Sequence, residues 1–158
     1  MEPLARAESM DQGKPVNIAR KVDIPRAAYN FRKVGLYMRI EETRFSFIFQ
    51  FAHAWQSLLD TSQAVGGAGV VNISSRHPVG VAGLISPWNL PLYLLTFKIA
   101  PAIMTGNPVV CKPSEMTSVT AWMLCGLMRE AGLPPGVVNM VFGFGRTVGE
   151  SIVTHPKV

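Results

Sequence analysis

Asn89 ends a short polar segment that follows the apolar run Val79–Ile85. Its side-chain amide could point from a loop into a cleft and donate a hydrogen bond to an oxygen that becomes negative during a reaction. An amide cannot serve as a general acid or base. A second interpretation, which the sequence leaves open, is a turn asparagine that bonds its own backbone or caps a helix beginning at Pro91. The neighbouring Trp88 is equally open, because ordinary packing would also explain a tryptophan there.

Lys112 closes a second apolar run, Val109–Lys112, and Glu115 lies three residues further on. A carboxylate accepts hydrogen bonds from the vicinal hydroxyls of a ribose, and a lysine adds a donor that favours phosphate. The alternatives are a surface ion pair, which contributes little to stability, and the opening residues of the next helix. The spacing alone leaves these interpretations open.

Three glycines follow a third apolar run and precede a predicted helix: Gly143, Gly145 and Gly149. The spacing departs from the dinucleotide motif G-x-G-x-x-G, because the last glycine falls one residue late. Glycines at these positions would still let a ligand approach the backbone closely, with Arg146 available to a phosphate. A tight turn that binds no ligand is the alternative.

Neither of the two cysteines is placed as a nucleophile. Cys111 lies inside an apolar run and Cys125 in the middle of a predicted helix, whereas a reactive thiolate needs an exposed, electropositive setting. His53, His77 and His155 are scattered, without an acid or a nucleophile at a supporting spacing. We therefore predict no catalytic triad and no metal site.

Apolar runs and helical segments alternate over residues 76–158. The predicted strands are Val79–Ile85, Val109–Lys112 and Val137–Phe142, and the predicted helices are Pro91–Thr105, Thr117–Ala131 and Thr147–Thr154. Strands this apolar, without alternation, are typical of a parallel sheet covered on both faces, with right-handed crossovers. The expected fold is an α/β doubly wound, Rossmann-like sheet. Ligands of such sheets gather at the carboxyl ends of the strands, where every polar residue singled out above is expected to lie.

The N-terminal part, residues 1–75, is predicted to be mainly helical and to end at a domain boundary. Pro15–Tyr37 is typical of a surface helix that is interrupted near Pro25. Glu41–Leu59 has helical spacing, although Phe45–Phe51 would equally suit a strand.

The composition indicates a folded globular protein, with 48% hydrophobic and 16% charged residues. Fifteen basic and ten acidic residues give a net charge of +5. The basic residues are dispersed among acids and accompany no nucleic-acid-binding motif, so we expect no nucleic-acid partner. Residues 1–20 mix acids and bases, which excludes a secretory or transit signal there, and no apolar run approaches the ~20 residues that cross a bilayer. We expect a cytoplasmic protein without a membrane partner.

An ordered set of segments resembles the NAD-dependent aldehyde dehydrogenase superfamily. The segments are Pro78–Val81, Ile85–Pro91, Ala100–Ala102, Gly106-Asn107, Lys112–Glu115, Leu133–Gly136, Asn139 and Gly143–Gly149. The resemblance runs from Arg76 to Val158, and Ala5–Phe31 is similar to the segment upstream of it in the family. Within the family, Leu92–Thr96 and Val119–Cys125 are most similar to one subfamily that oxidises a semialdehyde.

The resemblance implies a role for each candidate residue. Asn89 would hold the substrate oxygen in an oxyanion hole. Lys112 and Glu115 would bind the adenosine ribose of NAD, and Gly145 and Gly149 would flank the adenine. The remaining residues of the expected cofactor cleft are Ile85, Ser86 and Trp88. The reaction implied is attack of a cysteine on the aldehyde, hydride transfer to NAD and hydrolysis of the thioester to a carboxylate.

The resemblance also implies what this chain lacks. The family's nucleophilic cysteine and general-base glutamate would lie beyond Val158, so we expect a truncated chain that is inactive alone. Residues 34–75 diverge from the family and are not expected to contain its β-hairpin, which puts ordinary assembly in doubt. The alternatives are a non-enzymatic fragment that associates with itself or with a full-length relative, and a non-functional product.

Overall fold

The structure is a computed structural model, and it describes residues 1–34, 62–65, 71–75 and 77–158. The segment Glu41–Leu59, which the sequence left open between a helix and a strand, lies outside the described residues.

The centre of the fold is a three-stranded parallel sheet, in which β3 (Ala82–Ile85), β4 (Val109–Lys112) and β5 (Val138–Met140) lie in that order. This confirms the parallel sheet predicted from the uniformly apolar runs. β4 has the predicted bounds, whereas the other two strands are shorter. At the start of β3 the reason is local: the backbone N–H of Val79 donates to Oδ1 of Asn107 at 2.7 Å and not to a neighbouring strand.

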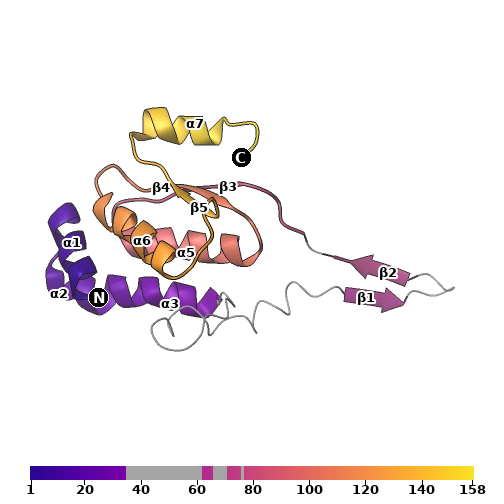
Figure 1. The fold of residues 1–158 in the computed structure, drawn as a ribbon, viewed down its shortest axis with the longest axis horizontal. Helices are drawn as coiled ribbons and strands as arrows, with labels where there is room; N and C mark the ends of the chain where they lie inside the picture. Colours follow the sequence, from indigo (N-terminus) through magenta and orange to yellow (C-terminus); the bar gives the residue numbers. More distant parts are fainter. Residues whose placement is uncertain (35–61, 66–70, 76) are drawn as a thin grey trace.

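Helices cover both faces of the sheet, as the doubly wound prediction required. α5 (Pro91–Met104) and α6 (Val119–Glu130) connect the strands and lie together on one face, while the π-helical turn η3 (Gly145–Gly149) and α7 (Glu150–Val153) lie on the other (Figure 1). The expected last helix, Thr147–Thr154, is therefore a π-helical turn followed by a short α-helix.

Gly83 explains how closely α7 approaches the sheet. Side chains alternate between the faces of a strand, so Leu84 packs against the core under the sheet while Gly83 faces α7. A Cβ atom at Gly83 would lie 2.6 Å from Cγ2 of Ile152 and 2.8 Å from Cγ1 of Val158. A larger residue at this position would push α7 away from β3.

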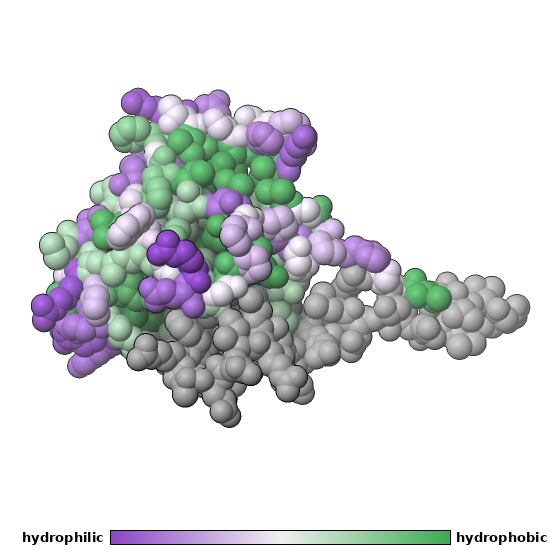
Figure 2. Space-filling model, in the orientation of Figure 1, coloured by the Kyte–Doolittle hydropathy of each residue, from purple (hydrophilic) through white to green (hydrophobic). Residues whose placement is uncertain are grey.

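Sheet, crossover helices and N-terminal helices share one hydrophobic core. Its fully buried members include Leu95 and Ile99 of α5, Val109 of β4, and Ala5 and Ile24 from the N-terminal region. In the space-filling view, hydrophilic residues gather over the N-terminal helices and the outer side of α7, and apolar residues lie between α7 and the rest of the molecule (Figure 2). The division of the chain into residues 1–75 and 76–158 stays a prediction.

The N-terminal region consists of α1 (Glu2–Gln12), α2 (Val16–Ile18), the π-helical turn η1 (Ala19–Asp23) and α3 (Ile24–Val34). The predicted interruption near Pro25 is this π-helical turn. Pro25 lacks an N–H and its ring crowds the carbonyl of the preceding turn, which a wider turn relieves. α3 packs along α5, and Asn30 Nδ2 donates to Tyr93 O at 2.9 Å.

β1 (Ser62–Val65) and β2 (Val71–Ser74) form an antiparallel pair that extends from the body of the molecule (Figure 1). The sequence analysis expected no β-hairpin within residues 34–75, and that expectation is wrong for these residues. Only half of the residues of the two short strands are apolar, and the others are serine, asparagine and glutamine, so the strand pattern is weak in the sequence.

Among the described helices, none is long and apolar enough to cross a membrane.

Candidate functional site

The predicted site residues follow adjacent strands at one edge of the sheet. The backbone N–H of Ser86, just after β3, donates to the carbonyl oxygen of Lys112 at 3.1 Å. The N–H of Val141, just after β5, donates to the carbonyl oxygen of Cys111 at 2.9 Å. These bonds hold the three exit segments against β4, so the carboxyl edge is a continuous surface with Lys112 at its centre.

Lys112 is only 2% exposed, although it carries a charge. Its Nζ donates to Pro113 O at 2.8 Å and lies 3.5 Å from Oε2 of Glu115. Glu115 is exposed, and its pKa is lowered, first by its own backbone N–H and then by the Lys112 ammonium. Glu115 is therefore ionised at neutral pH and faces solvent beside a buried cation. The surface ion pair left open above fits the exposure of Glu115 but not the burial of Lys112.

Of the two predicted glycines, Gly149 lies next to this lysine. A Cβ atom at Gly149 would lie 3.7 Å from Cδ of Lys112, and a Cβ atom at Gly145 would meet nothing within 4 Å. Arg146, which the sequence made available to a phosphate, instead places its guanidinium 5.7 Å from the centroid of the Phe144 ring. Its interaction in this structure is a cation–π contact.

Asn89 neither caps a helix nor bonds its own backbone. Its side chain is exposed and makes no hydrogen bond with any residue in the described ranges, and the N-cap position of α5 is Leu90. Its backbone carbonyl is held, since Gln12 Nε2 donates to it at 3.3 Å and Lys14 Nζ at 3.1 Å. The backbone is anchored and the amide is free to face a ligand, which favours the donor interpretation over the turn or cap.

The three residues expected to line the cofactor cleft differ in exposure. Ser86 is 3% exposed, whereas Trp88 is 53% and Ile85 37% exposed. Two large apolar side chains on the open side of a charged edge would suit a ring system that stacks on them. The assignment of all three to a cofactor stays a prediction.

Carboxylates of α1 cap both crossover helices, which the sequence analysis missed. Glu8 Oε2 accepts from Leu92 N–H in the first turn of α5 at 3.4 Å, and Asp11 Oδ2 accepts from Val119 N–H at the start of α6 at 2.9 Å. Carboxylates favour helix N-termini because the first N–H groups lack partners and carry the positive end of the helix dipole. The only sequence signal was the mixed charge of residues 1–20, which the sequence analysis used solely to argue against a targeting signal.

Glu8 belongs to a buried cluster with Asp23 and Lys14. The Lys14 ammonium contacts Asp23 Oδ2 directly and lies 3.9 Å from Glu8 Oε1, and neither carboxylate side chain is exposed. Burial and the facing Asp23 carboxylate raise the pKa of Glu8 to about 7. At neutral pH the pair therefore holds a proton for part of the time.

Neither cysteine can serve as a thiolate at neutral pH. Cys111 is fully buried in the core, and burial, aided by Cys125, raises its pKa to about 12. Burial also raises the pKa of Cys125, whose Sγ donates to Ala121 O at 3.4 Å. Both observations agree with the prediction that neither is a nucleophile. Within the described ranges, no three His, Cys, Asp or Glu side chains group to hold a metal ion.

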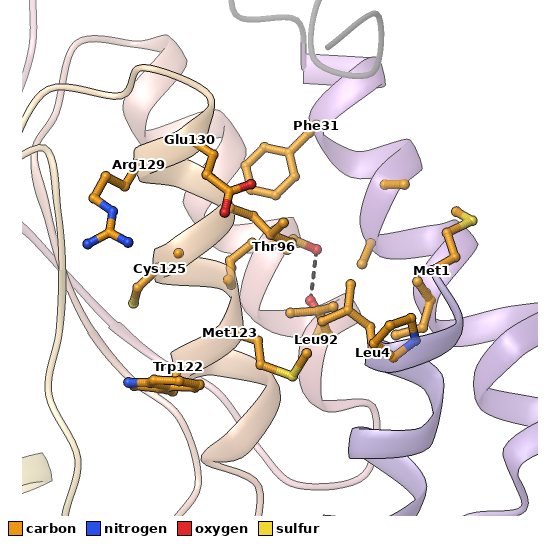
Figure 3. Close-up of a pocket in the computed structure, with 17 residues that line it drawn as sticks. Met1, Leu4, Phe31, Leu92, Thr96, Trp122, Met123, Cys125, Arg129 and Glu130 are labelled. Carbon is orange, nitrogen blue, oxygen red and sulfur yellow. Dashed lines mark hydrogen bonds between the residues drawn. The ribbon is translucent and has the colours of Figure 1, made fainter. Parts of the chain in front are cut away.

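A cavity of about 850 Å³ lies elsewhere, between the N-terminal helices and α6 (Figure 3). It is lined by apolar side chains such as Leu4, Phe31 and Leu92, with Arg129 and Glu130 at the α6 end. None of the candidate site residues lines it. The cavity is thus separate from the carboxyl edge of the sheet.

A parallel sheet with helices on both faces and polar residues after the carboxyl ends of its strands is typical of the dinucleotide-binding α/β proteins. The comparison with known families is more specific, because the model of the aldehyde dehydrogenase family matches residues 1–158. The chain belongs to the aldehyde dehydrogenase family. The match is wider than the resemblance inferred above, since it includes residues 34–75.

Curated relatives and solved structures agree with this. The chain is 56% identical over 158 residues to the 2-aminomuconic semialdehyde dehydrogenase of Danio rerio, and 53% identical over 160 residues to that of Homo sapiens. This confirms the subfamily suggested by Leu92–Thr96 and Val119–Cys125. All of this chain aligns, yet it spans 29% of the length of either relative.

Among solved structures, a putative aldehyde dehydrogenase from Burkholderia cenocepacia has a TM-score of 0.83 at 38% identity. An NAD+ complex of an aldehyde dehydrogenase from Bacillus cereus has a TM-score of 0.83 at 33% identity. Each match covers 99% of this chain and 28% of the solved chain. The likeness therefore includes the arrangement of the sheet and its helices.

Proposed function

We propose that this chain binds the adenosine part of NAD and supplies an oxyanion donor for the oxidation of an aldehyde to a carboxylate. The observation that supports it is the position of Asn89, the Lys112–Glu115 pair and the two glycines in segments that follow adjacent strands, with Lys112 beside both Glu115 and Gly149. Similarity to 2-aminomuconic semialdehyde dehydrogenases favours a semialdehyde as the substrate.

The residues at the edge fit the adenosine of NAD. Glu115 is ionised and exposed, so its carboxylate can accept from ribose hydroxyls, and the Lys112 ammonium lies beside it as a donor. Gly149 lets the backbone of η3 lie close to the Lys112 chain, since a Cβ atom there would already be in van der Waals contact with Cδ of Lys112 at 3.7 Å. NAD supplies a hydride acceptor when bound.

Asn89 would act at the reacting centre without exchanging a proton. Its amide N–H can donate to the aldehyde oxygen, and this bond strengthens as negative charge develops on that oxygen in the transition state. Because the backbone of Asn89 is held from α1 and the following loop, the donor is positioned before the substrate arrives.

We expect the wild-type chain to bind NAD saturably in a calorimetric titration. Glu115→Ala should weaken binding about tenfold or abolish it, because the ribose loses its acceptor. Lys112→Ala should do the same, provided that urea unfolding shows it folded, since Lys112 is buried. Glu150→Ala, an exposed acid on α7, is the matched control and should bind like the wild type. A folded wild-type chain that gives no heat with NAD would contradict the proposal.

We also propose that this chain alone does not turn over an aldehyde. A thioester mechanism needs a thiolate, and the raised pKa of both thiols leaves them protonated at neutral pH. No NADH absorbance should appear when the purified chain is mixed with NAD and a semialdehyde. NADH formation that survives Cys111→Ser and Cys125→Ser would show that another group performs the chemistry.

A second proposal is association with another copy or with a full-length relative. Among the described strands, β3 and β5 each have one edge without a hydrogen-bonded neighbour, and such an edge can pair with another chain. The segment Phe45–Phe51, which the sequence analysis found equally suited to a strand, lies outside the described residues. A cytoplasmic location, expected in the sequence analysis, stays a proposal.

A further inference from the structure

The segment Ser86–Leu90, which carries Asn89, is attached to the N-terminal region on both sides of the start of α5. On one side, the Asn89 carbonyl accepts from Gln12 Nε2 and Lys14 Nζ. On the other side, the Leu92 N–H donates to Glu8 Oε2. Between these anchors lie only Leu90 and Pro91, so movement of either anchor is transmitted to Asn89.

Lys14 joins the two anchors. The same ammonium that donates to the Asn89 carbonyl contacts Asp23 Oδ2 and lies 3.9 Å from Glu8 Oε1. Lys14 is 12% exposed and the two carboxylates are not exposed at all, so solvent screens these interactions little. The charges that face Glu8 come from η1, as Asp23, and from the α1–α2 loop, as Lys14, while α5 contributes the Leu92 N–H.

The cluster has one cation for two carboxyl groups. Glu8 Oε1 and Asp23 Oδ1 are both buried and have no hydrogen-bond partner among the described residues. A proton shared by these oxygens would satisfy both and leave one negative charge, which Lys14 balances. Loss of that proton leaves two carboxylates that compete with the Asn89 carbonyl for the ammonium. The raised pKa of Glu8 is consistent with such a shared proton.

We propose that Lys14 is a positioning residue for Asn89, and that the protonation of the Glu8–Asp23 pair sets how firmly Lys14 holds the Asn89 carbonyl. The catalytic consequence of this proposal rests on the proposed function, in which Asn89 is the oxyanion donor. In the protonated state the carbonyl is held firmly. In the deprotonated state the ammonium is drawn to the carboxylates and the Ser86–Leu90 segment loosens.

The test is nuclear magnetic resonance of the isotope-labelled full chain from about pH 5.5 to about pH 8.5. The Leu90 amide, whose nitrogen is bonded to the Asn89 carbonyl carbon, and the Leu92 amide should shift with one common midpoint. Glu8→Gln, which mimics the protonated carboxyl, should remove that titration from both amides. Separate midpoints, or a titration that persists in Glu8→Gln, would overturn the proposal.

Substitutions of Lys14 separate positioning from general stability. Lys14→Met should shift the Leu90 amide and the Asn89 side-chain amide, and should speed hydrogen exchange of Leu92 about tenfold. Lys14→Arg should restore part of the wild-type shifts, because the donor and charge return. Lys21→Met, an exposed lysine of η1, is the control and should change none of them.

The outcomes distinguish the positioning role of Lys14 from the NAD binding that is proposed above. Unchanged Asn89 and Leu90 resonances in a folded Lys14→Met chain would overturn the positioning role, whatever NAD does. If Lys14→Met does not fold, the proposal is tested by the titration of the Leu90 and Leu92 amides in the wild-type chain and by its removal in Glu8→Gln. A chain that shows the coupling but binds no NAD would refute the proposed function and leave the link between Lys14 and Asn89 in place.

Discussion

Glu8→Gln is expected to remove most of the pH dependence of stability between about pH 5 and about pH 8. In the folded chain the pKa of Glu8 is about 7, against an ordinary value of 4.5. Between these two values the folded chain retains a proton that the unfolded chain has lost. The stabilising effect of the neutral carboxyl is therefore complete below about pH 4.5 and is lost as the pH rises to about 7.

The expected size of this effect is on the order of a few kcal/mol, because each pH unit between the two pKa values is worth ~1.4 kcal/mol. A glutamine at this position can donate to Asp23 Oδ1 and accept from the Leu92 N–H, as the protonated carboxyl does. At about pH 8 the variant should thus be more stable than the wild type.

Urea unfolding at several pH values measures this difference directly. Glu130→Gln, at an exposed acid on α6, is the matched control and should keep the wild-type profile. A Glu8→Gln chain whose stability falls with pH as steeply as that of the wild type would contradict the expectation.

Gly143→Ala is expected to lower the free energy of unfolding by about 2–4 kcal/mol. Gly143 has a φ angle of 153°, which side chains rarely adopt, and a Cβ atom there would lie 2.4 Å from Cγ2 of Val148. Val148 is branched at Cβ and cannot easily turn away. The η3 turn would have to move, and with it the backbone of Gly149 beside Lys112.

Gly145→Ala is the matched comparison, two residues further along the same turn. A Cβ atom there meets nothing within 4 Å, so stability should change little. If Gly145 flanks the adenine as proposed, this variant should nevertheless weaken NAD binding in the calorimetric titration. Equal losses of stability in the two variants would show that Gly143 is not a conformational requirement.

Much of the sheet was predictable because its signals are local. The apolar run Val109–Lys112 became β4 with the same bounds, and Pro91 opens α5, where its missing N–H costs nothing. The interruption near Pro25 was also predictable from a single residue, although it is a π-helical turn and not a break in the helix. Such features depend on a few neighbouring residues, which a sequence displays.

The location of the candidate site could be predicted from the sequence, but the contacts that hold its residues in place could not. The strand ends identify Asn89, Lys112 and Glu115, yet their roles at a cofactor or substrate stay predictions. Nothing local shows that Lys112 is buried, or that Glu8 and Asp11 serve helices far along the chain. Spacing that suits solvated charge equally suits carboxylates that cap a distant helix, and only the tertiary fold distinguishes them.

The capping carboxylates of α1 also bear on how this chain folds. Glu8 and Leu92 are separated by 84 residues, and Asp11 and Val119 by 108 residues. Contacts of such long separation require closure of large loops and tend to form late in folding. The first turns of the crossover helices would then gain their caps only when the N-terminal helix docks, after the sheet and its helices have begun to form.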